Sequence, residues 1–315
     1  IEGWEHFARR LANQKYNIYI TGSNAKMLSR EIATTLGGRF WNKDVYPYSF
    51  AEYLNARNII LSKNWIYGKQ AAEVSKAFND YFLYGGFPEL TDVIAKRVWL
   101  NDIYSKIFFS DLIVRNKVRN EEALGLLVRR LAENVKQPVS YTRLANLISS
   151  IGIKISKATV IEFIRYLKES CLIFPIENYA AKFAERNSNM KHYFIDNGLL
   201  SIFLLDGNTS LLENIVAIHL YKRYGAQLYF YNQNIEVDFV IPEAKTAIQV
   251  SYSLMDETTC RREVEGLIKL NRVFPMDNMC IITRDEERII THESGVSIHV
   301  IPVWKWLLKE EPLRT

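Results

Sequence analysis

The chain has 315 residues, which favours two or three domains over one small module. Hydrophobic residues make up 48% and charged residues 24%, with 14 Gly and 8 Pro, a composition that excludes a disordered or low-complexity protein. Its three cysteines form no C-x-x-C pair, and no apolar run reaches the ~18 residues of a membrane span. We therefore expect an ordered cytoplasmic protein with no disulfide framework, no zinc ribbon and no membrane partner.

The net charge of +5 is concentrated in the middle of the chain. Residues 115–169 carry 11 Lys and Arg against 5 Asp and Glu, a local charge of +6, while the rest of the chain is close to neutral. A basic segment of this kind is the electrostatic pattern of a nucleic-acid contact, although a solvated basic face has the same pattern.

Helical and strand patterns alternate near the N-terminus. The spacing of apolar residues predicts a helix at 3–12, a strand at 17–21, a helix at 25–36 and a strand at 40–45. In α/β proteins, ligands usually bind at the carboxyl ends of strands. We therefore expect an α/β lobe with a polar site just after residue 21.

The following stretch is predicted to be entirely helical. Helices are expected at 50–58 and 73–84, then a break at Gly85-Gly86, then long helical material over 91–119. We therefore interpret this stretch as a helical connector.

Three short helices and a β-hairpin are predicted next, with Ser140 and Ser156 as caps of the second and third helices. This is the outline of a winged helix-turn-helix with residues 156–169 as its recognition helix. Small helical bundles that pack on a hairpin give the same outline without binding DNA. If duplex DNA is the partner, we expect it to contact four basic residues: Lys154, Lys157, Arg165 and Lys168.

The C-terminal third is predicted to follow the order αβββαββ. The elements are expected at 211–224, 227–231, 236–241, 246–251, 258–270, 279–283 and 297–303, with a last helix at 303–308. Glu213 falls on the first helix, Asp238 on the second strand, and Gln249 and Ser251 on the third. Because side chains alternate along a strand, residues 249 and 251 point to one face.

This third resembles the PD-(D/E)XK nuclease-like fold. The resemblance implies that a helical Glu, a strand Asp and a second acid hold Mg²⁺, and that a lysine two positions on activates the attacking water. Glu213 and Asp238 match, and are the candidate metal ligands, but Gln249 replaces the second acid and Ser251 replaces the lysine. We expect Glu213, Asp238 and Gln249 to converge without cleaving nucleic acid. The structural alternative is an Asp238 that pairs with a nearby Lys or Arg, and a Glu213 that is favoured by the helix dipole.

The N-terminal lobe resembles AAA-type P-loop ATPases. Thr21-Gly-Ser-Asn24 at a strand end is similar to the sensor-1 segment, and Gly37-Gly-Arg39 to the trailing arginine. The resemblance implies that Asn24 orients the water that attacks ATP and that Arg39 reaches a phosphate. The alternatives are a helix cap for Asn24 and a solvated turn for Arg39. No G-x-x-x-x-G-K-[ST] loop occurs in these residues, so we expect no ATP hydrolysis by this chain as given.

Further motifs extend the resemblance over the whole chain. They are Phe87-Pro88, Asp111-Leu112, residues 193–199, Glu213-Asn214 and residues 236–240. The chain is similar to a prokaryotic AAA-type ATPase fused to a C-terminal domain of unknown function, here without the Walker A and B part. The resemblance implies ATP and Mg²⁺ as cofactors of a full-length parent and none in this chain.

We therefore expect an α/β and α+β multidomain protein in four parts: a truncated ATPase lobe at 1–58, a helical connector at 59–120, a winged helix at 121–200 and a nuclease-like αβββαββ domain at 205–315. The leading hypothesis is the C-terminal portion of an AAA-type ATPase, with a winged helix that docks DNA or protein and an inactive nuclease-like domain. The alternatives are a Mg²⁺-dependent DNA nuclease and a non-catalytic protein-interaction module.

Overall fold

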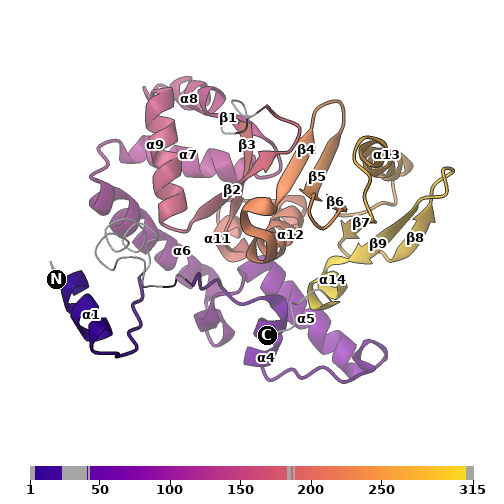
Figure 1. The fold of residues 1–315 in the computed structure, drawn as a ribbon, viewed down its shortest axis with the longest axis horizontal. Helices are drawn as coiled ribbons and strands as arrows, with labels where there is room; N and C mark the ends of the chain where they lie inside the picture. The colour runs from indigo at the N-terminus through magenta and orange to yellow at the C-terminus, as the bar shows by residue number, and fades with distance from the viewer. Residues whose placement is uncertain (1–3, 23–40, 42, 183–185, 187–188, 310–315) are drawn as a thin grey trace.

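The structure is a computed structural model, which describes residues 4–22, 41, 43–182, 186 and 189–309. It is a mixed α/β protein built on one nine-stranded sheet with the order β1-β3-β2-β4-β5-β6-β7-β9-β8. Helices α7, α8 and α9 gather at one end of the sheet, while α4, α5 and α14 lie together along another side (Figure 1). No helix in the described part is both long and apolar enough to cross a membrane.

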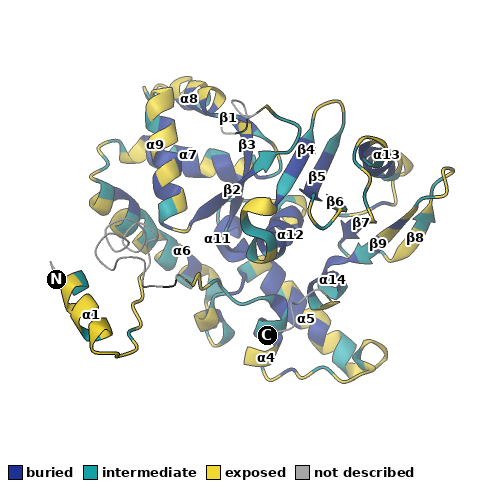
Figure 2. Ribbon diagram, in the orientation of Figure 1, coloured by how far each residue is buried: buried dark blue, intermediate teal, exposed yellow. Residues whose placement is uncertain are grey.

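The N-terminal helix α1 (Trp4–Asn13) stands apart from the rest of the molecule (Figure 1). Its surface is mostly exposed, as the yellow of Figure 2 shows, and Phe7 is 53% exposed. The strand expected at 17–21 is wrong: residues 16–22 are irregular, and Tyr19 is 90% exposed. An isolated β-strand leaves its backbone groups unpaired, and these residues pair with no strand in the described ranges. The helix expected at 25–36, Asn24 and Arg39 lie outside the described residues.

The stretch from residue 50 to residue 114 is mostly helical and contains a π-helix that the sequence pattern did not predict. Its elements are α4 (Phe50–Ala56), η1 (Trp65–Tyr67), α5 (Lys69–Tyr84), η2 (Pro88–Thr91), α6 (Lys96–Lys106) and η3 (Ile107–Val114). Ser49 and Glu52 form a capping box that starts α4, and Gly85, with φ of +79°, ends α5. The π-helical η3 continues α6 without a break.

A compact unit of three helices and three short strands follows. It contains α7 (Glu121–Glu133), β1 (Val139–Ser140), α8 (Tyr141–Ser149), α9 (Lys157–Glu169), β2 (Ile173–Asn178) and β3 (Asn189–Phe194). The expected caps are confirmed, because Ser140 Oγ accepts from the Arg143 amide and Ser156 Oγ from the Thr159 amide. β3 pairs with β1 and with β2, both antiparallel.

The remaining elements follow the predicted order, with three additional elements: the strand β8 and the short helices α11 and η4. They are α11 (Asn197–Ser201), α12 (Asn208–Tyr224), η4 (Gly225–Gln227), β4 (Tyr229–Asn232), β5 (Glu236–Ile241), β6 (Thr246–Val250), α13 (Glu257–Val273), β7 (Asn278–Thr283), β8 (Arg288–Thr291), β9 (Ser297–Pro302) and α14 (Val303–Lys309). β4, β5 and β6 form an antiparallel meander, and β7 and β9 continue the sheet in parallel. β2 joins β4 in parallel, which makes the sheet continuous.

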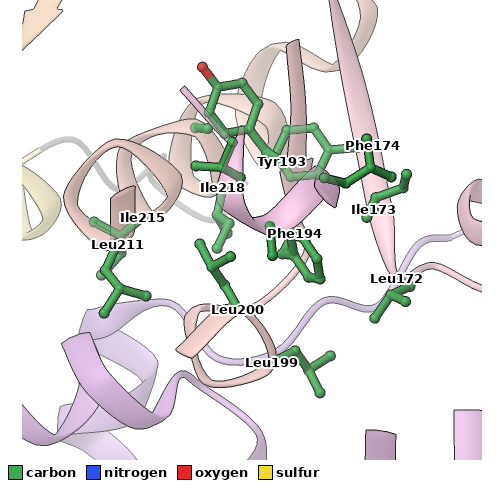
Figure 3. Packing of buried hydrophobic residues seen from close by; sticks show 14 of the residues in the cluster. Leu172, Ile173, Phe174, Tyr193, Phe194, Leu199, Leu200, Leu211, Ile215 and Ile218 are labelled. Carbon is green, nitrogen blue, oxygen red and sulfur yellow. The ribbon is translucent and has the colours of Figure 1, made fainter. Parts of the chain in front are cut away.

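Two hydrophobic clusters lie on opposite faces of the sheet at β6 and β7. On β6 and β7, the neighbours Ala247 and Ile248, and Ile281 and Ile282, fall into different clusters, as side-chain alternation requires. The larger cluster runs from Phe50 through α7–α9 and α12 to α14. Figure 3 shows its centre, where β2, β3, α11 and α12 meet. The connector, the three-helix unit and the C-terminal elements thus share one core, and the four-part division remains a prediction.

Candidate functional site

A buried lysine on β3 lies among three carboxylates from other elements. Lys191 Nζ is 3.0 Å from Asp238 Oδ1, 3.3 Å from Glu213 Oε1 and 3.3 Å from Glu236 Oε1. The Lys191 side chain is 0% exposed, whereas that of Glu236 is 40% exposed at the rim. Tyr193 Oη also donates to Glu213 Oε1, at 2.7 Å. We call Lys191, Tyr193, Glu213, Glu236 and Asp238 the lysine cluster.

Secondary structure brings these side chains together. Residues 191 and 193 are two apart on β3, and 236 and 238 are two apart on β5, so each pair points to one face of the sheet. α12 packs against β3 and supplies Glu213. The second carboxylate oxygen of Asp238 accepts from the Val250 amide at 2.9 Å.

The charges of the cluster do not balance. Burial lowers the pKa of Lys191, but the carboxylates of Glu213, Asp238 and Glu236 outweigh burial and raise it, so the ammonium is charged. Burial raises the pKa of Glu213 to about 8 against the opposing effect of Lys191, and Asp238 adds to the rise. Because one ammonium cannot neutralise three carboxylates, we infer that Glu213 carries a proton near neutral pH.

Gln249 joins this site through the backbone. Its Oε1 accepts from the Asp238 amide at 2.9 Å, and its Nε2 donates to the Glu236 carbonyl at 3.0 Å. Ser251 is bonded outside the lysine cluster, since its Oγ donates to the Ser253 carbonyl. Glu213 and Asp238 therefore meet at Lys191, whereas Gln249 bonds to the β5 backbone and Ser251 bonds to the Ser253 carbonyl.

The cluster does not fit a resident Mg²⁺ ion. A metal held by Glu213 and Asp238 would need the space between their oxygens, where the Lys191 ammonium lies. Over the described residues, no group of three or more His, Cys, Asp or Glu side chains is arranged to hold a metal. The pairing of Asp238 with a nearby lysine is the structural alternative considered from the sequence.

Sequence reasoning missed Lys191. The partners of Lys191 lie 22 and 47 positions away along the chain. A lysine two positions before a tyrosine, in a strand that also contains Met190 and Phe194, was the available signal, since a buried lysine needs a buried counter-charge.

The four basic residues expected to contact DNA are all exposed: Lys154, Lys157, Arg165 and Lys168. Arg165 is partly neutralised by Glu162 and Glu169 on the same helix, at 3.9 Å and 3.4 Å. The three lysines form no ion pair within the part of the chain that the structure describes. α9 thus presents lysine charge on its outer side, which is yellow in Figure 2.

Two segments of the chain match known protein families. Residues 1–54 match the model of the AAA domain, which indicates an AAA-type ATPase, and residues 75–210 match a domain of unknown function (DUF8612). An uncharacterized protein of Haemophilus influenzae is 31% identical over 280 residues, covering 86% of this chain and 67% of the relative. An uncharacterized protein of Methanocaldococcus jannaschii is 33% identical over 322 residues, covering 98% of this chain and 72% of the relative. No solved structure matches significantly. In this chain, the residues that match the AAA domain precede those that match the domain of unknown function. The chain belongs to the protein family of the Methanocaldococcus jannaschii relative.

Proposed function

We propose that this chain is the DNA-docking part of an AAA-type ATPase and that its nuclease-like region is a non-cleaving scaffold. The observation that carries the proposal is the exposed lysine charge of α9 within the unit α7-β1-α8-α9-β2-β3. A helix of this kind enters the major groove in helix-turn-helix proteins, and its lysines bind phosphates. ATP would bind in the full-length parent, with Asn24 and Arg39 as candidate contacts.

The strand order supports a winged helix for residues 121–200. β3 lies between β1 and β2, so the hairpin β2-β3 packs beside the three helices and receives β1 at its edge. This arrangement leaves the outer face of α9 free of the sheet. Among the four candidate residues, Lys157 and Lys168 are expected to contribute more than Arg165, because Arg165 has acidic partners.

A salt-dependent titration of duplex DNA tests docking. The double variant Lys157→Glu, Lys168→Glu should bind at least tenfold more weakly at low salt, and the slope of log affinity against log salt should fall by about 2. The control Lys63→Glu, Lys69→Glu makes the same charge change at exposed positions of the connector and should bind like the wild type. Equal loss in both double variants would show that only net charge matters, and α9 would not be the docking surface.

The lysine cluster supports the non-cleaving scaffold. Each of the four positions of the nuclease resemblance already has an internal partner: Lys191 for Glu213 and Asp238, the β5 backbone for Gln249, and Ser253 for Ser251. Incubation of supercoiled plasmid with Mg²⁺ or Mn²⁺ should therefore give no more nicking than the Asp238→Ala variant. Metal-dependent nicking that Asp238→Ala abolishes would make the chain a nuclease instead.

A second candidate function is protein docking by the same helix. Ile161 is 43% exposed on α9, four residues after Lys157 and four before Arg165, so an apolar side chain lies within the basic face. Such a mixed face suits a protein partner. If wild-type chain shows no DNA binding at low salt, this function replaces the first.

A further inference from the structure

Residues 46–49 are held by α5, by Gly86 shortly after it, and by α12. We call these four residues the strap; they follow the exposed residues Trp41 and Val45, which are 95% and 91% exposed. The Tyr48 amide donates to the Gly86 carbonyl at 2.7 Å, and the Tyr48 carbonyl accepts from Tyr81 Oη on α5 at 2.8 Å. The backbone of the strap is thus fixed on both sides of one residue.

A third bond comes from the other side of the chain. Lys222 Nζ on α12 donates to the Pro47 carbonyl at 2.6 Å and lies 5.7 Å from the centre of the Tyr46 ring. Lys222 is 175 positions from Pro47, so this contact joins the end of the AAA-matched residues to the C-terminal elements.

Gly86, which binds Tyr48 through its carbonyl, also binds a buried carboxylate through its amide. The Gly86 amide donates to Asp196 Oδ2 at 2.7 Å, and Asp196 Oδ1 accepts from the Gly198 amide at 2.8 Å, where α11 starts. The fit is close: a Cβ at Gly85 would lie 1.9 Å from Asp196 Oδ1. The Asp196 side chain therefore cannot shift without disturbing the strap.

A chain of buried amides continues from Asp196 to the sheet. Asn197 Nδ2 donates to the Phe82 carbonyl of α5 at 2.9 Å, and Asn197 Oδ1 accepts from Asn214 Nδ2 at 2.9 Å. Asn214 Oδ1 in turn accepts from the Phe194 amide of β3 at 2.8 Å. Asn214 adjoins Glu213, and Phe194, at the centre of Figure 3, lies on the strand of Lys191. The chain of bonds ends at two elements that carry the lysine cluster.

We propose that the strap is the coupling element between the AAA-matched residues and the body formed by α12 and β3. The proposal rests on the assignment of an AAA-type ATPase to those residues. A displacement of the strap breaks buried hydrogen bonds, and such bonds are costly to leave unmade. The strap therefore moves with the body, and a displacement of the strap is transmitted through Gly86, Asp196 and Asn214.

Hydrogen exchange on the whole chain, without nucleotide or DNA, tests the coupling. Tyr81→Phe removes the bond to the Tyr48 carbonyl and keeps the ring. We expect exchange to rise at least tenfold at the Tyr48 and Gly86 amides and also at the Phe194 amide, while peptides of β7 (Asn278–Thr283) change less than threefold. Lys222→Met should give the same pattern from the opposite side of the strap.

Tyr231→Phe is the matched control, because it removes a tyrosine hydroxyl bonded to Gln233 within the second hydrophobic cluster. It should leave the Phe194 amide unchanged. The proposal is overturned if the exchange rate rises at the Tyr48 and Gly86 amides and not at the Phe194 amide. It is also overturned if the exchange rate of the β7 peptides rises equally. The hydrogen-exchange measurement uses no DNA. A failed DNA titration would therefore contradict the docking function and not the coupling role of the strap. A negative hydrogen-exchange result would contradict the coupling role and not the docking function.

Discussion

At the scale of single residues, the lysine cluster is where sequence and structure differ most. Glu213 and Asp238 were selected because the nuclease-like resemblance implies acids at these positions, and both bond to Lys191, whereas Gln249 bonds to the backbone of β5. Lys191 could not be selected, because nothing local in the sequence shows that a lysine on a distant strand points at the same carboxylates. Its ammonium provides the positive charge that buried carboxylates require.

We predict that Lys191→Met strongly destabilises the protein. The methionine fills similar volume, but Asp238 loses its buried counter-charge, which costs about 3–5 kcal/mol when one partner of a buried pair is removed. Urea denaturation monitored by circular dichroism measures the loss. The control Lys245→Met breaks a pair with Asp277 in which both side chains are more than half exposed, and should cost less than about 1 kcal/mol. Similar values for the two variants would show that the cluster does not need the ammonium.

A buried histidine, His192, and a partly exposed one, His219, predict acid sensitivity. Burial, with a smaller contribution from nearby cations, lowers the pKa of each to about 4. Since unfolded histidine titrates near pH 6.5, the unfolded state takes up protons first, and stability is lost as the pH falls from about 6.5 to 4, by about 3 kcal/mol for each residue. In His192→Leu, the free energy of unfolding should depend less steeply on pH over this range. His299→Leu changes an exposed histidine and should keep the wild-type slope.

At the scale of elements, the predictable parts were those set by local chemistry. Apolar spacing and the caps Ser140 and Ser156 located α8 and α9, because a serine hydroxyl that accepts an amide hydrogen bond defines a helix start. The strand expected at 17–21 failed because a strand forms only beside a partner. The short edge strand β8 was missed for the related reason that its register is set by β9 and not by its own pattern.

The junction of α5 and α11 predicts a large cost for Gly85→Ala. Gly85 has φ of +79°, and an added Cβ would collide with Asp196 Oδ1 at 1.9 Å. We expect a loss of about 3 kcal/mol in the free energy of unfolding, from backbone strain and the collision together. Gly152→Ala is a matched control, since its φ is +93° but no heavy atom lies within 4 Å of the added Cβ, so that strain alone of about 1 kcal/mol is expected. Equal losses of unfolding free energy in the two variants would show that the Asp196 side chain moves away from the added Cβ without destabilising the protein.

At the scale of the whole molecule, the shared core predicts one cooperative unfolding transition. The larger cluster includes residues of the connector, the three-helix unit and the C-terminal elements, and Trp65 of η1 packs edge-on against Trp304 of α14 with ring centres 5.6 Å apart. Tryptophan fluorescence and far-ultraviolet circular dichroism should therefore report the same midpoint in urea. Midpoints that differ by more than experimental error would show separately folding domains, as the four-part division from sequence implies.

The parallel pairing of β2 with β4 sets the orientation of any duplex on α9. This pairing joins the three-helix unit to the C-terminal strands, with Glu177 opposite Tyr229 and Asn178 opposite Phe230. The Asn178 side-chain Nδ2 also donates to the Asn232 carbonyl at 2.6 Å. Rotation of the three-helix unit against the C-terminal strands would break these hydrogen bonds. If duplex DNA docks on α9 as we propose, it is therefore held at a fixed angle to the strap. The strap, the sheet and α9 then rotate as one rigid body. A small rotation of this body about the residues before Tyr46 would turn the DNA through the same angle and move it over a longer arc.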